Sequence, residues 1–151
     1  GASHAERPGV AKVRADEAAA KLDQAEGYKG FTAKCEGVRD GLVDFLTSAG
    51  HGRKTVAAYG AAAKGNTLLN YCGIGANQIA YCVDKNPAKQ KTLLPGSQIP
   101  VFDVDELRRR RPDFILILPW NLKSEIMGQL SDLRAQGTIF VTAVPSVSVT
   151  A

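Results

Sequence analysis

The stretch 56–67 constrains this chain more than any other, because it predicts a strand, a turn of small residues and a helix in direct succession. Val56–Tyr59 is a short apolar run typical of a buried strand, and Asn66–Tyr71 has the apolar spacing of a helix. The turn between them consists of glycine and alanine, with Lys64 as its charged residue. Such a turn places free backbone N–H groups and the positive end of a helix in front of an anion.

Two interpretations of this turn are open. In the first it binds a phosphate or pyrophosphate, and Lys64 adds a mobile charge with three hydrogen-bond donors. The turn matches neither the G-x-G-x-x-G fingerprint nor the P-loop, so it does not imply the ligand of either motif. In the second interpretation the small residues only allow the helix to pack closely on the strand.

Apolar runs and helical patterns alternate along the chain, which is typical of an α/β fold. Strands are predicted at 56–59, 78–83, 99–102, 114–118 and 138–142, and helices at 10–25, 31–49, 66–71, 103–111 and 123–136. The residues after Pro145 are either an edge strand or a loose tail. We therefore expect a Rossmann-like three-layer fold with a mainly parallel sheet of four or five strands, preceded by an N-terminal helical pair. Residues 7–151 are expected to form a single domain.

Charge and cysteine content narrow the class of protein. A net charge of +4 suits a phosphorylated ligand, and much of the excess lies in Arg108–Arg111, where we expect a solvated helix end and no nucleic-acid partner. The three cysteines form no C-x-x-C pair, which favours reduced thiols in a cytoplasmic protein without a metal site. No run has membrane-spanning length and no signal peptide is visible. Gly1–His4 resembles a cloning remnant, and residues 1–6 are predicted to be disordered.

Asp84 follows the second predicted buried strand, about 20 residues beyond Gly60, where dinucleotide-binding folds hold a ribose hydroxyl. It is also suited to cap the turn before Asn86 and Pro87, because aspartate is favoured in such turns. Both interpretations remain open.

Two further segments are candidates for the walls of a site. Pro95 and Gly96 form a constrained loop, which is either a ligand wall or a plain turn. Trp120 and Asn121 follow the most hydrophobic predicted strand, and ligands of open α/β sheets bind at the carboxyl ends of strands. The alternative for Trp120 is that it caps the core beside a helix start.

Several longer motifs occur in one order along the chain, namely Ala57–Asn70, Val83–Pro87, Leu94–Val101, Arg111–Asp113, Ile117–Leu122 and Glu125–Ile126, together with the helix start around Tyr28 and Phe31. This series resembles the C-terminal domain of the sugar C-methyltransferase family. These S-adenosylmethionine-dependent enzymes methylate a carbon of a nucleotide-linked keto-deoxysugar. One departure is Lys91-Thr92, where the family pattern has a glycine followed by a basic residue.

The resemblance implies a longer enzyme, in which a zinc-binding N-terminal domain and a middle S-adenosylmethionine domain accompany a domain like this one. We expect the present chain to be an excised domain or a stand-alone relative that binds neither cofactor and is inactive by itself. The implied partners are a dTDP-type nucleotide-linked sugar and the enzyme's own N-terminal and middle domains. No catalytic residue is predicted, because His51 lies in a loop before the first strand and forms no pair with a glutamate.

Residue chemistry and the resemblance together predict a substrate-binding set at the carboxyl edge of the sheet. It comprises Tyr59, Gly60, Ala61, Ala62, Lys64, Gly65, Asn66, Asp84, Lys85, Pro95, Gly96, Trp120 and Asn121.

Two other functions are compatible with the sequence. A structural or docking domain would leave an apolar patch exposed on the helix at 31–49 or near Trp120. A dinucleotide-binding protein would use Asp84 to bind a ribose, although the third glycine of that fingerprint is absent.

Overall fold

A computed structural model describes residues 7–151, so the predicted cloning remnant Gly1–His4 and the disorder predicted for residues 1–6 lie outside the described residues. The chain divides into two compact units, Gly1–Cys35 and Glu36–Ala151. Each unit is described by itself. The single domain expected over residues 7–151 stays a prediction.

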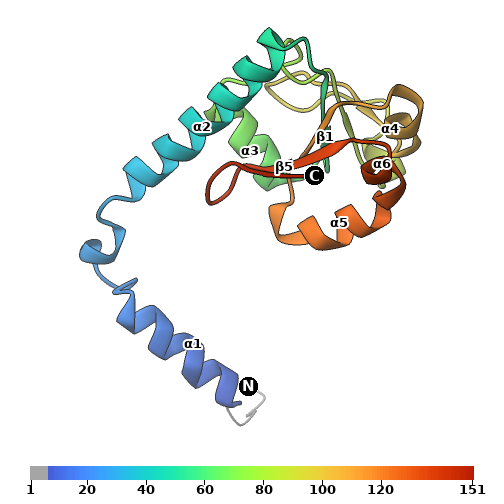
Figure 1. The fold of residues 1–151 in the computed structure, drawn as a ribbon. Helices are drawn as coiled ribbons and strands as arrows, with labels where there is room; N and C mark the ends of the chain where they lie inside the picture. Colours follow the sequence, from blue (N-terminus) through green and yellow to red (C-terminus); the bar gives the residue numbers. More distant parts are fainter. Residues whose placement is uncertain (1–6) are drawn as a thin grey trace. The chain divides into compact units, whose positions relative to one another are not determined.

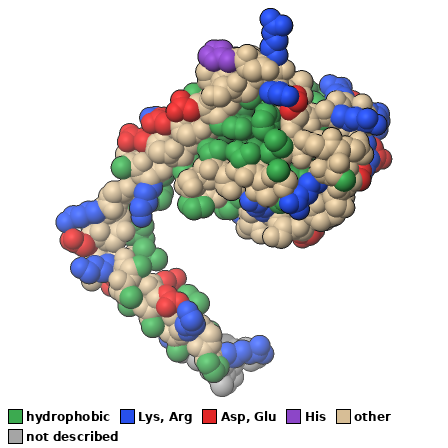
Figure 2. All heavy atoms as spheres, in the orientation of Figure 1, with side chains coloured by type: hydrophobic (Ala, Val, Ile, Leu, Met, Phe, Trp, Pro, Cys, Tyr) green, Lys and Arg blue, Asp and Glu red, His purple; other side chains and the backbone are tan. Residues whose placement is uncertain are grey.

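The described part of the first unit is helical and has no buried side chain. Helix α1 covers Pro8–Ala19, the 3-10 turn η1 covers Ala25–Tyr28, and helix α2 begins at Phe31. The helix predicted at 10–25 therefore ends earlier, and Lys21 beyond its end has a left-handed φ of 55°. Hydrophobic side chains lie on the surface of this segment (Figure 2).

A six-stranded sheet forms the centre of the second unit, with strand order β3-β2-β1-β4-β5-β6. The strands are β1 Val56–Tyr59, β2 Tyr81–Val83, β3 Val101–Phe102, β4 Phe114–Ile117, β5 Ile139–Thr142 and β6 Ser148–Thr150. Strands β1 to β5 are parallel, and β6 pairs antiparallel with β5. The mainly parallel α/β fold is thereby confirmed. The sheet has six strands rather than four or five, because the residues after Pro145 form an edge strand.

Helices cover both faces of this sheet (Figure 1). On one face lie α3 Ala63–Tyr71 and the part of α2 (Phe31–His51) that belongs to the second unit; on the other lie α4 Asp105–Arg110, α5 Lys123–Gln129 and α6 Ser131–Ala135. Two short 3-10 turns, η2 Pro87–Lys89 and η3 Trp120–Leu122, follow β2 and β4. Among residues 7–151, no helix combines the length and the apolar character needed to cross a membrane.

The main boundary differences occur at helix ends. Helix α3 begins at Ala63, so Lys64 lies in its first turn rather than in the loop before it. Gly50 does not end α2, which continues to His51 and stops where Arg53 takes a left-handed φ of 54°. The helix predicted at 123–136 is two helices, because Leu130 leaves helical geometry with φ −111° and ψ 26°.

The arginine run at the end of α4 is exposed, and its first three side chains form ion pairs. Arg108 Nε lies 2.7 Å from Asp132 Oδ2 and thereby joins α4 to α6. The Arg110 guanidinium lies over the rings of Tyr81 and Phe102, at 4.8 Å from each centroid. These arginines therefore help to hold helices and sheet together.

Asp113 joins the starts of β1 and β4 at the amino edge of the sheet. Its carboxylate accepts hydrogen bonds from Thr55 N at 2.8 Å, Thr55 Oγ1 at 2.9 Å and Lys54 Nζ at 2.9 Å. The backbone bond from Thr55 is the main reason that the pKa of Asp113 falls to about 2, and the bond from Lys54 adds to it. This carboxylate stabilises the fold only while it is ionised.

We expect Asp113→Asn to lower the free energy of unfolding at pH 7 by about 1 kcal/mol, since solvent screens a side chain that is 35% exposed. A folded-state pKa below the ordinary value gives stability that is complete above about pH 4 and is lost as the pH falls through about 2. The difference between wild type and variant in urea unfolding should therefore shrink between pH 4 and pH 2. A difference that stays constant over this range would contradict the assignment.

Candidate functional site at the carboxyl edge of the sheet

The site lies where the strand order reverses. Strands β1 and β4 are neighbours, and the sheet grows outward from them in opposite directions. The chain leaves β1 into α3 on one face and leaves β4 into η3 and α5 on the other. The crevice between two such connections is the usual ligand position in open α/β sheets.

Two glycines allow these connections to approach each other closely. Gly60 has a φ of 94°, and a Cβ atom there would lie 2.6 Å from Pro119 Cδ. A Cβ atom on Gly65 would lie 2.5 Å from Leu118 Cβ. At these two positions close packing explains why the residue is glycine, and close packing was one of the two interpretations of the turn.

Three residues of the predicted set meet beside the start of α3. Lys64 Nζ donates a hydrogen bond to Asn121 Oδ1 at 2.9 Å, and it lies 4.9 Å from the centroid of the Trp120 ring. The N-cap residue Ala62 supplies no capping side chain, and the first turn of α3 has no acidic residue. The first N–H groups of a helix have no partner within it, so this end is available to an anion next to a lysine ammonium.

Asp84 links the segments that follow β1 and β2 through hydrogen bonds. Its Oδ2 accepts from Ala61 N at 2.7 Å and pairs with Lys89 Nζ at 3.3 Å, and its Oδ1 accepts from Asn86 N at 2.8 Å. The residue is only 9% exposed. These contacts favour the turn-capping interpretation over a ribose-binding role.

The loop of Pro95 and Gly96, which was predicted as a wall of the site, lies against the side of α3. Asn70 Nδ2 donates to Pro95 O at 3.0 Å and to Asn66 O at 2.8 Å, and a Cβ atom on Gly96 would collide with the Asn70 amide. Pro95 and Gly96 therefore contact α3 and do not line the pocket described next. The Asn66 Oδ1 atom is buried and has no partner among the described residues.

A pocket of about 230 Å³ opens on the α5 side of the same edge. Half of its lining belongs to the predicted set, namely Tyr59, Gly60, Ala62, Asp84 and Lys85. The other half was not predicted and comes from the segment after β4, namely Pro119, Leu122, Glu125, Ile126 and Gln129. The pocket and the cluster of Lys64, Trp120 and Asn121 thus lie at the ends of the same two strands, β1 and β4.

A chain of polar side chains runs along the pocket wall. Tyr59 Oη donates to Gln129 Oε1 at 3.4 Å, and Gln129 Nε2 donates to Glu125 Oε1 at 2.8 Å. Burial raises the pKa of Tyr59, and the charges of Asp84 and Glu125 raise it further, so this phenol stays protonated at neutral pH. The spacing of Glu125 and Gln129, four residues apart beside the buried Ile126, was a signal that the sequence offered for this wall.

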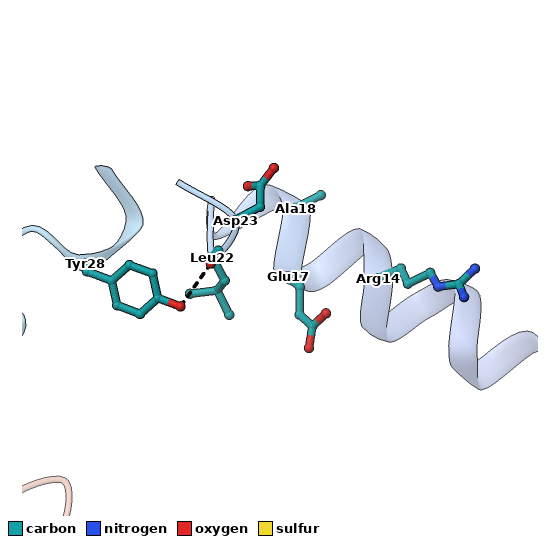
Figure 3. A pocket seen from close by; sticks show the side chains of 6 residues that line it. All are labelled: Arg14, Glu17, Ala18, Leu22, Asp23 and Tyr28. Atoms are coloured by element: carbon teal, nitrogen blue, oxygen red, sulfur yellow. Dashed lines mark hydrogen bonds between the residues drawn. The ribbon is translucent and has the colours of Figure 1, made fainter. Parts of the chain in front are cut away.

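A larger pocket of about 470 Å³ belongs to the first unit and is lined by Arg14, Glu17, Ala18, Leu22, Asp23 and Tyr28. Tyr28 Oη donates to Leu22 O at 2.9 Å, whereas Glu17 and Asp23 are directed away from each other (Figure 3). All of these residues are exposed. The pocket is a hollow on the surface of this unit.

Comparison with known proteins identifies the family. A profile of the family described as "C-methyltransferase C-terminal domain" matches residues 1–145. The chain belongs to this family. The C-methyltransferase NovU of Streptomyces niveus is 34% identical over 144 residues, which are 95% of this chain and 34% of that protein. This C-methyltransferase C-terminal domain thus spans about a third of the length of its curated relative.

Among solved structures, the crystal structure of UDP-D-quinovosamine 4-dehydrogenase from Vibrio fischeri has 18% sequence identity and a TM-score of 0.42. The match covers 59% of this chain and 76% of that chain.

The departure from the family pattern at Lys91 falls on a special backbone position. Lys91 has a φ of 61°, a left-handed conformation that glycine adopts at little cost. Its N–H still donates to Val101 O at 2.8 Å. The loop of this C-methyltransferase C-terminal domain therefore has, at Lys91, a backbone conformation that a glycine favours.

We expect Gly60→Ala to lower the free energy of unfolding by about 1–3 kcal/mol, because the new methyl group meets the Pro119 ring at a positive φ. Gly37→Ala in α2 is the matched control. A Cβ added there would lie more than 4 Å from the other described residues outside its own stretch of helix, so this change should stabilise the protein by about 0.5–1 kcal/mol. Chemical denaturation measures the free energy of unfolding of both variants. Equal effects of the two substitutions would contradict the close contact between Gly60 and Pro119.

We expect Asp84→Ala to destabilise the ligand-free protein by about 1–3 kcal/mol, since it leaves the Ala61 N–H without its acceptor. Asp84→Asn keeps an acceptor oxygen and should cost less. Thermal melting without ligand distinguishes the two roles of Asp84. An unchanged melting temperature in Asp84→Ala would favour the ribose-binding role over the structural role.

Proposed function

We propose that this C-methyltransferase C-terminal domain binds a dTDP-type nucleotide-linked keto-deoxysugar and positions it for methylation on carbon. The observation that carries the proposal is the group of Lys64, Trp120 and Asn121 at the start of α3, where the strand order reverses. A nucleotide-linked sugar contains a pyrophosphate, which suits a lysine ammonium beside an uncapped helix start. Membership of the family supports the link to methyl transfer.

The domain's own part in such a reaction is to bind and orient the substrate. Methylation next to a ketone needs a base that removes the α-proton and a donor held in line with the carbon. S-adenosylmethionine supplies the methyl group as a sulfonium when bound, and we propose that it is held by other parts of a longer enzyme. The same is proposed for zinc, because residues 7–151 contain no group of three or more His, Cys, Asp or Glu side chains placed to hold a metal ion.

The alternative is a docking role, in which the domain packs against the rest of a longer enzyme and binds no ligand by itself. The exposed apolar side chains of the first unit favour it, among them Phe31 at 61% and Tyr28 at 55% exposure. Leu122, next to Trp120, is 43% exposed. Ligand binding by the isolated chain separates the two functions.

Thermal melting against dTDP, UDP, GDP, NAD and S-adenosylmethionine tests the proposal. A nucleotide at about 100 times its dissociation constant adds roughly 2.7 kcal/mol, which gives a clear shift for a domain of this size. We expect selective stabilisation by dTDP that Lys64→Ala and high salt weaken, because both reduce the attraction of the pyrophosphate.

Lys34→Ala, at an exposed lysine of the first unit, is the matched control and should leave the dTDP shift unchanged. Stabilisation by NAD in place of dTDP would favour a dinucleotide-binding protein. A flat response across the whole panel would contradict independent nucleotide binding and favour the docking role.

A further inference from the structure

We propose that Glu125 and Gln129 form a hydroxyl-binding subsite, which holds a polyhydroxylated ring of the ligand in the pocket beside Tyr59. The proposal rests on the proposed function, since it assigns one part of the same ligand to one part of the site. Neither residue belongs to the set expected from the sequence.

The size of the pocket suits one ring rather than a whole nucleotide-linked sugar. Its volume of about 230 Å³ is below the range of roughly 300–1,000 Å³ found for pockets that enclose complete drug-sized ligands. The remainder of the ligand must therefore lie outside it, toward α3 or over the open edge of the sheet.

The charge of the pocket opposes a phosphate group. Among the described residues that line the pocket, Asp84 and Glu125 are acidic and Lys85 is basic. The pyrophosphate is better placed at Lys64, which does not line the pocket and belongs to the uncapped start of α3. The two parts of the edge thus differ in the ligand groups that they favour.

Glu125 is the carboxylate of the pocket that can accept hydrogen bonds from ligand hydroxyls. The Asp84 carboxylate already receives Ala61 N, Asn86 N and Lys89 Nζ. Glu125 is exposed, and in the described part of the chain its carboxylate receives one hydrogen bond, from Gln129 Nε2 to Oε1 at 2.8 Å. Its Oε2 is therefore open to a hydroxyl donor, and an ionised carboxylate accepts such bonds strongly.

Gln129 holds this acceptor in place and is itself held by Tyr59. Its amide accepts from Tyr59 Oη at 3.4 Å and donates to Glu125, so the three side chains support one another. Pro119, Leu122 and Ile126 add apolar lining to the same pocket. A sugar ring presents hydroxyls at its rim and C–H groups on its faces, and this combination of polar and apolar lining matches both.

Two rings of a nucleotide-linked sugar carry hydroxyls, namely the hexose and the pentose, which is deoxyribose in dTDP and ribose in UDP, and isothermal titration calorimetry can tell the two rings apart. The probes are dTDP-glucose, dTDP, UDP and inorganic pyrophosphate, each titrated into wild type, Glu125→Gln and Gln129→Met. Glu36→Gln is the matched control, because Glu36 is an exposed glutamate that does not line the pocket. Melting of each ligand-free variant confirms that it is folded.

We expect Glu125→Gln to weaken dTDP-glucose binding by about tenfold, the effect of losing one charge-assisted hydrogen bond, while pyrophosphate binding is not weakened. Gln129→Met should weaken dTDP-glucose binding less than Glu125→Gln does, because the Glu125 carboxylate remains. Unchanged dTDP affinity in Glu125→Gln assigns the subsite to the hexose. Equal losses for dTDP and dTDP-glucose, with a larger loss for UDP because of its 2′-hydroxyl, assign the subsite to the pentose.

Wild-type affinity of both variants for every probe would overturn the subsite and leave the proposed function standing. Failure of the wild-type chain to bind any of the nucleotides would overturn both. A loss of pyrophosphate binding equal to that of dTDP-glucose would also overturn the subsite, because Glu125 would then act on the whole site rather than on a ring.

Discussion

The close approach of backbone to side chain at Gly60 and Gly65 is the constraint on which the functional edge of this domain depends. Pro119 occupies the space of a side chain at Gly60, and Leu118 occupies it at Gly65. These contacts bring α3 and the segment after β4 together over two adjacent strands. Lys64 therefore reaches Asn121 and Trp120, and the lining from α5 faces the end of β1. A larger residue at either glycine would separate the two halves of the edge.

The carboxylates at the edges of the sheet differ in their roles. Asp113 at the amino edge and Asp84 at the carboxyl edge each accept hydrogen bonds from backbone N–H groups of neighbouring segments, and so they hold strands and turns in register. Glu125 receives only the amide of Gln129 among the described residues. A carboxylate that accepts several hydrogen bonds from the protein stabilises structure, whereas one with an open oxygen atom can accept hydrogen bonds from a ligand.

Much of the edge was predictable, because parallel strands bring their carboxyl ends to one side. The apolar runs located β1 and β4, and residues of the segments that follow them, Lys64 with Trp120 and Asn121, do meet. Glu125 and Gln129 were missed because they lie on a helix further along, where exposed polar residues are common. Pro95 and Gly96 lie against α3 instead, because Asn70 binds their loop. Their roles toward a ligand stay predictions.

The sequence by itself determined the class of fold and the family, because hydrophobic periodicity and long ordered motifs are local properties of the chain. It also located the small residues between 60 and 65, which allow close packing. Only the tertiary structure decided that Asp84 accepts from Ala61 N, Asn86 N and Lys89 Nζ, and that Gln129 joins Tyr59 to Glu125 along the wall of a pocket. Such choices depend on contacts between residues far apart in the chain, and spacing along a sequence does not specify which hydrogen-bond partner a side chain finds.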